Sequence, residues 1–262
     1  MPYFDSLTSN TPNGLTNAAP YQTLGQAGFP DPTWAHIYAN DFDTYTAGDW
    51  TVTLVGTGTQ ALTAGVGGRL LVSNTAGASD ATYMQKTPAG FNIPAAQPSP
   101  STGKQCFFKF SGQLSAVSAD VWFAGVAQAG ATTIASITNG IYIAKATGQA
   151  GLTLNVVAAS VTQTVNFPAT CVLTAATDFE VGFMVDVYGN VAGFWNPTTG
   201  WSTPISSANL AAGTQTRGYA CALYAPTMPA STTLVSPIMG LLNSSAVANT
   251  MQVDYLLFSN DR

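Results

Sequence analysis

Acidic residues that alternate along one apolar segment are the first candidates for chemistry. Asp178, Glu180 and Asp186 lie in the run from Asp178 to Trp195, and Glu180 is the only glutamate of the chain. Residues two apart in a β-strand point to the same face and lie about 7 Å from each other. Pairs of carboxyl groups at similar separations hydrolyse glycosidic bonds. The spacing permits glycan hydrolysis, and the alternative is that the acids are solvent-facing charges on an apolar hairpin.

Other catalytic groups are scarce. His36 is the only histidine, and the chain has no Gly-x-Ser-x-Gly sequence to present a nucleophilic serine. The glycine-rich run at 65–68 precedes a predicted strand rather than a helix, so it provides no helix N-terminus for a phosphate group. It predicts a hairpin turn instead. We therefore expect a protein that is not an enzyme and that holds no cofactor.

The three cysteines do not form a metal or redox motif. Cys106, Cys171 and Cys221 are widely spaced, form no Cys-x-x-Cys pair, and each lies in an apolar segment. A reduced, buried thiol behaves as a small hydrophobic group. We expect the three to be reduced and distant from one another, as is typical of proteins made in a reducing cytoplasm.

Alternating apolar residues predict β-strands through most of the chain. From Ile37 onward the pattern has a period of two, and Gly, Pro and Asn interrupt it at intervals that suit an all-β sandwich. Trp50, Val52 and Leu54 share the expected core face of one strand, and Trp122 and Phe183 are expected core residues of two others. Gly189-Asn190 suits the tight turn of a hairpin over 178–195. No helix of three turns is expected. Further strands are predicted at 69–73, 81–85, 106–110, 121–126, 140–144, 152–157, 161–167, 217–224, 234–242 and 250–258.

The composition limits the classes of partner. Charged residues make up 7% of the 262 residues, against about 25% in a typical soluble domain, and the formal net charge is −5. Seven scattered basic residues cannot form the cationic surface that binds nucleic acid. No apolar run approaches the roughly 18 residues of a membrane span, and the first residues do not resemble a signal peptide. A surface with so few charges indicates that partner subunits cover part of it, although extracellular lectins have similar surfaces.

The first 36 residues differ from the rest. Five prolines and several Asn and Gly turn signals interrupt any regular element there, yet the segment carries many large apolar side chains. We expect an extended N-terminal arm over 1–36 and one β-sandwich domain over 37–262, with 94–102 as a long surface loop. The arm could fold back on its own domain or dock on another subunit. Its expected partner-binding residues are Tyr3, Phe4, Leu7, Leu15, Tyr21 and Leu24.

Three segments carry a resemblance to a known fold family. Asn40-Asp41-Phe42-Asp43 with Trp50-Thr51-Val52 resembles the opening strand of concanavalin A-like and laminin-G-like jelly rolls. The hairpin at 179–196 and the segment Val253–Phe258 are similar to a hairpin and to the closing strand of that family. The resemblance implies a two-sheet antiparallel jelly-roll sandwich over about residues 37–260. It supports a fold more than a function.

The resemblance also bears on chemistry. Glycosidases of this group commonly carry a pattern resembling Glu-x-Asp-x-x-Glu, whereas this chain has Gly182 and Met184 between its acids. Several jelly rolls bind a structural Ca²⁺ between their first and last strands, which implies Asp41, Asp43 and Asp254 as candidate ligands. The alternative is that these three aspartates lie at strand ends facing water.

Two functions follow as expectations. The Thr/Ala/Gly-rich composition with an aromatic arm also resembles tailed-bacteriophage virion proteins. We therefore expect a structural capsid decoration or cement protein, made in the host cytoplasm and located in the virion. It would bind major capsid or other virion subunits and form a homo-oligomer, with no nucleic acid or membrane partner. The alternative is a carbohydrate-binding module of a phage fibre or a lectin. Trp195, Trp201 or Tyr188 would then stack on the sugar.

Overall fold

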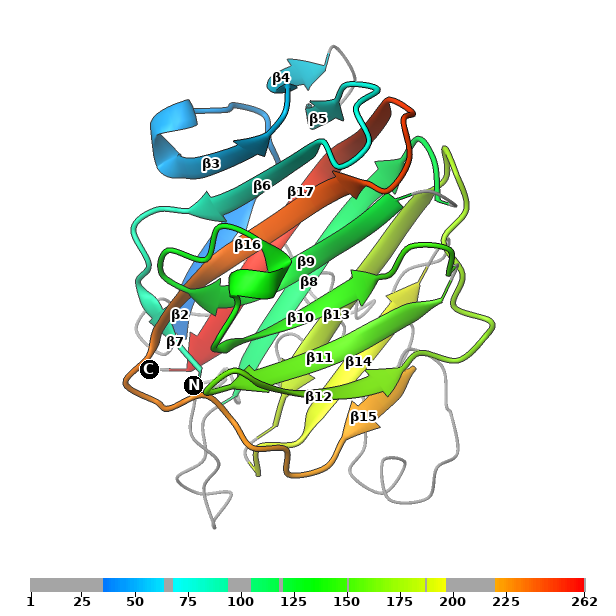
Figure 1. The fold of residues 1–262 in the computed structure, drawn as a ribbon. Helices are drawn as coiled ribbons and strands as arrows, with labels where there is room; N and C mark the ends of the chain where they lie inside the picture. Colours follow the sequence, from blue (N-terminus) through cyan, green and yellow to red (C-terminus); the bar gives the residue numbers. More distant parts are fainter. Residues whose placement is uncertain are drawn as a thin grey trace, which may run out of the picture.

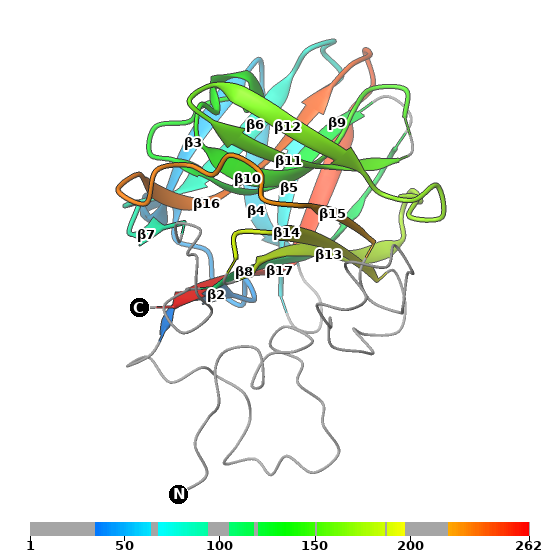
Figure 2. The same cartoon turned by 90° about the horizontal axis from the view of Figure 1, so that it is seen from below.

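The computed structural model describes residues 35–63, 68–93, 105–117, 120–149, 151–186, 188–196 and 220–261. Two antiparallel β-sheets of eight strands each form its two layers, which Figure 2 shows edge-on. The helical content of the described residues is two short 3₁₀ turns, η2 (Ala47–Asp49) and η3 (Ile134–Ser136). This confirms the expected all-β sandwich. No helix in these ranges has the length and apolarity to cross a membrane. Residues 1–34 of the expected arm and the loop at 94–102 lie outside the described residues, whereas residues 35 and 36 belong to β2 (Ala35–Asn40).

The sheet at the front of Figure 1, here called sheet I, has the strand order β12-β11-β10-β9-β16-β6-β3, and β7 also pairs with β16. All its pairings are antiparallel. Its strands are β3 (Trp50–Val55), β6 (Ala81–Lys86), β7 (Phe91–Asn92), β9 (Asp120–Gln128), β10 (Gly140–Lys145), β11 (Leu152–Ala158), β12 (Val161–Asn166) and β16 (Leu234–Asn243).

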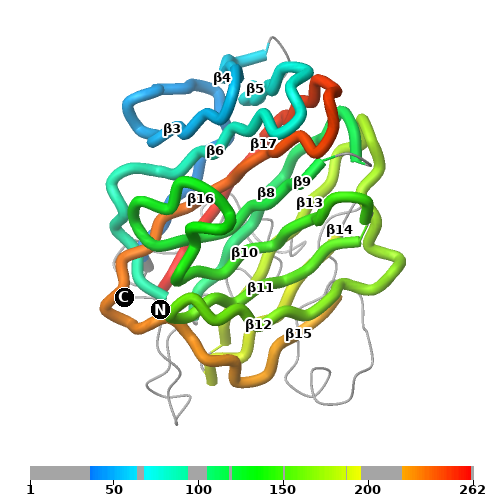
Figure 3. The backbone as a smooth tube through the Cα atoms, viewed as in Figure 1, coloured from blue at the N-terminus to red at the C-terminus, as the bar shows by residue number. Residues whose placement is uncertain are grey.

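The other layer, sheet II, has the order β15-β14-β13-β8-β17-β5-β4, and β2 also pairs with β17. Its strands are β2 (Ala35–Asn40), β4 (Gly58–Thr63), β5 (Arg69–Asn74), β8 (Cys106–Leu114), β13 (Asp178–Val185), β14 (Val191–Asn196), β15 (Cys221–Leu223) and β17 (Asn249–Asp261). The chain changes sheets between consecutive strands, from β8 to β9 and from β16 to β17, as the tube in Figure 3 shows. Strands far apart in sequence therefore become neighbours.

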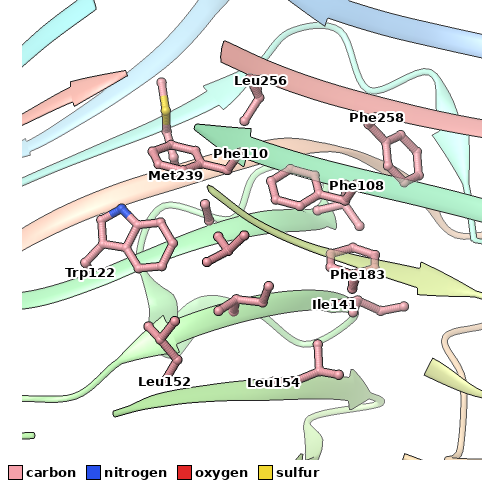
Figure 4. Close-up of a cluster of buried hydrophobic side chains, with 14 of the residues drawn as sticks. Phe108, Phe110, Trp122, Ile141, Leu152, Leu154, Phe183, Met239, Leu256 and Phe258 are labelled. Atoms are coloured by element: carbon pink, nitrogen blue, oxygen red, sulfur yellow. The ribbon is translucent and has the colours of Figure 1, made fainter. Parts of the chain in front are cut away.

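The core lies between the sheets and consists of the inward-facing half of each alternating strand (Figure 4). Trp122, Phe108 and Phe183 are fully buried, and the rings of Phe108 and Phe183 stack with centroids 5.2 Å apart. Trp50 is buried as well. The expected core positions Trp50, Trp122 and Phe183 are confirmed. Truncating one such aromatic side chain typically costs about 3–5 kcal/mol of stability.

The edge of the sandwich departs from the sequence-based prediction. Leu54 was expected in the core with Trp50 and Val52, but it is 45% exposed. It lies on β3, the edge strand of sheet I, beside Gly58 of β4, the edge strand of the facing sheet, and Gly58 has no side chain to cover it. Two further strands, β4 and β7, were not predicted, because one is weakly apolar and the other has two residues.

The hairpin of β13 and β14 matches the prediction closely. The two strands pair from Glu180 with Asn196 to Val185 with Val191. Gly189 adopts a φ of +82° in the turn, a conformation that glycine reaches at little cost. The carboxylate of Asp186 accepts backbone N–H bonds from Tyr188 at 2.9 Å and from Asn190 at 2.8 Å. Asp186 therefore stabilises the turn.

The outer face of sheet I is partly covered by its own chain. The connection between β9 and β10 carries η3 and contributes Ala131 and Ile137 to a second buried cluster that includes Tyr83, Phe123 and Tyr142. Gln85 fixes this connection, because its Oε1 accepts the N–H of Gly130 at 3.0 Å. The remaining face to consider for function is the outer face of sheet II.

Candidate functional site

Charged side chains gather on the outer face of sheet II. The chain has seven Lys and Arg and twelve Asp and Glu residues, and five of these nineteen come together on four neighbouring strands. Arg69 lies on β5, Lys109 on β8, Asp178 and Glu180 on β13, and Asp254 on β17. We call Asp178, Glu180 and Asp254 the carboxylate row.

Strand register explains why these residues share a face. Glu180 pairs with Ser111 and Asp178 with Gln113, so alternate residues of β13 and β8 point outward together. On β17 the pairing shifts between Val253 and Tyr255, which marks a β-bulge. Val253 and its third neighbour along the strand, Leu256, are both fully buried. The two residues between them, Asp254 and Tyr255, therefore both face outward.

Arg69 joins two members of the carboxylate row. Its Nη1 and Nη2 donate to the two oxygens of Asp178 at 2.7 and 3.0 Å, and its Nε lies 3.6 Å from Asp254 Oδ1. The hydrogen bond to Asp178 is the main reason that the pKa of Arg69 is raised. The hydroxyl of Ser111 donates to Asp254 Oδ2 at 3.2 Å. These contacts fix the orientation of both carboxylates.

The third carboxylate has a cation of its own. Lys109 Nζ lies 3.2 Å from Glu180 Oε2 and 5.9 Å from the ring centroid of Tyr255. Burial raises the pKa of Tyr255, and the nearby charges of Asp41 and Glu180 raise it further. Its hydroxyl is buried and has no hydrogen-bond partner among the residues that the structure describes. The face thus combines oriented hydrogen-bond acceptors with an aromatic ring.

The acids expected for hydrolysis are only partly brought together. Asp178 and Glu180 do share a face, but Asp186 is held in the hairpin turn. Position 182 has no room for a carboxylate, because a Cβ on Gly182 would lie 2.2 Å from the backbone oxygen of Phe108. Each of the two remaining acids is engaged by a cation. The arrangement suits hydrogen bonding to hydroxyl groups better than proton transfer.

The candidate calcium ligands do not form a ligand set. Asp254 pairs with Arg69 and Ser111, Asp41 follows β2 and lies near Tyr255, and Asp43 lies in the following turn. Within the described ranges, no three His, Cys, Asp or Glu residues are grouped so that they could hold a metal ion.

The expected sugar-stacking aromatics do not lie together either. Trp195 pairs with the buried Val181 and packs on the core residue Phe179, with centroids 6.1 Å apart. It is therefore a core-facing side chain, not a surface platform. Tyr188 is exposed in the hairpin turn, at the opposite end of β13 from Asp178. Trp201 lies outside the described residues. His36, the one histidine, lies in β2 with its ring edge-on to Phe91.

The cysteines are free and buried, as expected. Burial, with a smaller contribution from the nearby Cys171 thiol, raises the pKa of Cys221 to about 12. The expectation that the cysteines are reduced is confirmed, and the thiols of Cys171 and Cys221 influence each other electrostatically. Both thiols stay protonated and unreactive at neutral pH.

Sequence reasoning missed the two cations and the tyrosine of this face. Arg69 and Asp178 are 109 positions apart, and Lys109 meets Glu180 only because β8 lies next to β13. One signal was present: a lysine at an alternate position within the apolar segment Cys106–Phe110. Such a residue on a half-buried strand needs a partner of opposite charge.

Comparison with known proteins identifies the fold. Peanut lectin superposes with a TM-score of 0.53 at 9% identity, over 86% of this chain and 97% of that chain. An endo-β-1,4-glucuronan lyase from the fungus Trichoderma reesei gives 0.55 at 12% identity, over 84% and 94%. A protein of unknown function from Shewanella oneidensis MR-1 gives 0.53 at 13% identity, over 87% of each chain.

No family model and no curated protein sequence matches the chain. At these identities, the structural likeness shows the fold alone. That fold is the concanavalin A-like jelly-roll sandwich expected from the sequence, with two antiparallel sheets.

Proposed function

We propose that this protein binds carbohydrate through the outer face of sheet II, at the carboxylate row. The observation that carries the proposal is the gathering of Asp178, Glu180 and Asp254 on one face, each next to a cation. The lectin-like fold supports a binding role on such a surface.

The chemistry of the row suits sugar hydroxyls. Hydrogen bonds to an ionised carboxylate are shorter and roughly twice as strong as those between neutral groups. Arg69 and Ser111 already hold the carboxylates of Asp178 and Asp254 in place. Less side-chain freedom is therefore lost when a ligand binds. The Tyr255 ring next to Lys109 adds an apolar surface.

Binding is favoured over hydrolysis by the same contacts. Both oxygens of Asp178 are occupied by Arg69, so its carboxylate is poorly placed to attack a sugar ring. The close approach of Phe108 at Gly182 leaves no space for an acid at position 182, and the next outward residue of the strand is Met184. We expect no glycan digestion by the purified protein.

The test is a binding titration against a panel of neutral and acidic oligosaccharides. The double variant Asp178→Asn, Glu180→Gln should bind the oligosaccharide that the unchanged protein binds most tightly with at least tenfold lower affinity. This is a loss of roughly 1.4 kcal/mol of binding free energy. Asp49→Asn is the matched control, because Asp49 is an exposed acid that pairs with Lys86 at 3.9 Å on the other sheet's edge. Equal affinity of all three proteins, or no binding to any member of the panel, contradicts the proposal.

The virion role expected from composition stays a prediction. Its expected contact residues, Tyr3, Phe4, Leu7, Leu15, Tyr21 and Leu24, all lie outside the described residues. The expected homo-oligomer and the expected location in the virion stay predictions as well. A carbohydrate-binding module of a phage fibre would be consistent with both expectations.

A further inference from the structure

We infer that the glycan held at the carboxylate row is neutral, and not a polymer of uronic acids or of sulfated or phosphorylated sugars. This inference rests on the proposed function and adds the ligand class. It follows from which charges of the site reach the solvent and which are shielded.

The acids of the face are exposed, whereas its cations are covered. The side chain of Asp178 is 56% exposed, that of Asp254 40% and that of Glu180 30%. Arg69 is 26% exposed and Lys109 only 4%. A ligand approaching this face therefore meets carboxylate oxygens first.

Each cation already has an acidic partner. Arg69 uses Nη1 and Nη2 on Asp178 and has its Nε directed at Asp254. Lys109 lies against Glu180. An acidic sugar would have to displace one of these carboxylates, and the displaced acid would remain next to it. Like charges at such separations repel, more strongly at a partly shielded site than in open water.

The other cations within the described residues cannot help. Lys86 pairs with Asp49 and donates to the backbone oxygen of Thr87 on sheet I. Lys145 is fully buried. Among the described residues, three acids therefore outnumber two cations on this face, and Asp41 adds another negative charge near Tyr255.

Neutral hydroxyl groups meet no such penalty. A sugar hydroxyl can donate to the free lone pairs of Asp178 or Asp254 while the ion pairs with Arg69 stay intact. The amide of Gln113, which lies 3.4 Å from Asp178 Oδ1, adds a group that can both donate and accept.

The experiment compares oligosaccharides that differ only at C6. Three pairs of equal length serve as probes: β-1,4-glucan with β-1,4-glucuronan, β-1,4-mannan with β-1,4-mannuronan, and α-1,4-galactan with α-1,4-galacturonan. Affinities are measured at low ionic strength in EDTA, so that no divalent cation bridges the carboxylates. We expect the neutral member of the bound pair to bind at least tenfold more tightly. The preference should shrink at high salt, because salt screens exposed charges.

Variants show whether the row causes the preference. In Asp178→Asn, Asp254→Asn the ratio of neutral to acidic affinity should fall at least threefold, whereas Asp49→Asn should leave it unchanged. Equal or tighter binding of the acidic member overturns the inference and leaves the proposed carbohydrate binding standing. A preference that the double variant leaves intact overturns it too. Binding to none of the six probes counts against the proposed function, and the inference falls with it.

Discussion

At the scale of single residues, the least ordinary pair is Asp120 and Lys145. Both are fully buried at one end of the sandwich, and Lys145 Nζ donates to the backbone oxygen of Asp120 at 2.6 Å. Burial raises the pKa of Asp120 from its ordinary 3.8 to about 6, although the charge of Lys145 opposes the shift. Burial also lowers the pKa of Lys145.

The direction of the resulting pH dependence can be worked out. Between about pH 4 and pH 6, Asp120 binds more protons in the folded than in the unfolded chain. The free energy of unfolding therefore falls as pH rises through this range, and Asp120 contributes most stability when it is protonated.

Replacing Lys145 by methionine tests this pair. At pH 8, where Asp120 is ionised, the variant should lose about 3–5 kcal/mol, because a buried carboxylate is left without its nearby cation. At pH 4.5, where Asp120 is protonated, the loss should be clearly smaller. Urea unfolding at both pH values measures the difference. Lys86→Met, which removes the ion pair with the exposed Asp49, should change stability by about 1 kcal/mol or less. An equal loss for Lys145→Met at both pH values would be inconsistent with the electrostatic account.

At the scale of strands and sheets, the sequence was informative about local structure. The hairpin of β13 and β14 could be predicted because Phe179, Val181, Phe183 and Val185 recur with a period of two and Gly189-Asn190 suits a tight turn. Alternation also placed Asp178 and Glu180 on one face. It could not place Leu54, because exposure at a sheet edge depends on the facing sheet and not on the period of the strand.

The partners of the acids needed the strand order. β13 meets β8 on one side and β14 on the other, and neither Lys109 nor Arg69 is near it in sequence. Side-chain period gives the face on which a residue lies, but not the strand that lies next to it. Only part of the site was therefore predictable: two of its acids, without their cations.

Close approach of two strands at Gly182 gives a prediction at this scale. An added Cβ would lie 2.2 Å from the oxygen of Phe108 and 3.3 Å from the Cα of Lys109. Gly182→Ala should therefore destabilise the sandwich by about 1–3 kcal/mol, as overpacking does. Gly90→Ala is the control, since nothing lies within 4 Å of the added atom, and it should change stability by no more than about 0.5 kcal/mol. Equal midpoints of thermal unfolding for the two variants would show that β13 and β8 separate easily.

At the scale of the whole molecule, the two outer faces differ in character. Each outer face carries a buried apolar cluster, on sheet I under the connection that holds η3 and on sheet II around Phe107 and Leu257, so charge is what distinguishes the two faces. Sheet II carries the ion pairs of Arg69 and Lys109 and the carboxylate row. In a chain with so few charges, the gathering of charged side chains on one outer face is the main reason to assign ligand binding to sheet II.

The central claim is that carbohydrate binds at the outer face of sheet II, and fluorine NMR of protein labelled with 3-fluorotyrosine tests it most directly. Tyr255 lies beside Lys109 on the outer face of sheet II, whereas Tyr83 and Tyr142 lie on the outer face of sheet I. Single Tyr→Phe variants assign the three signals. On addition of the tightest-binding of the six oligosaccharides, the Tyr255 signal should shift with saturation and the other two should stay in place. A saturable shift of Tyr83 or Tyr142, with the Tyr255 signal unchanged, would contradict the account.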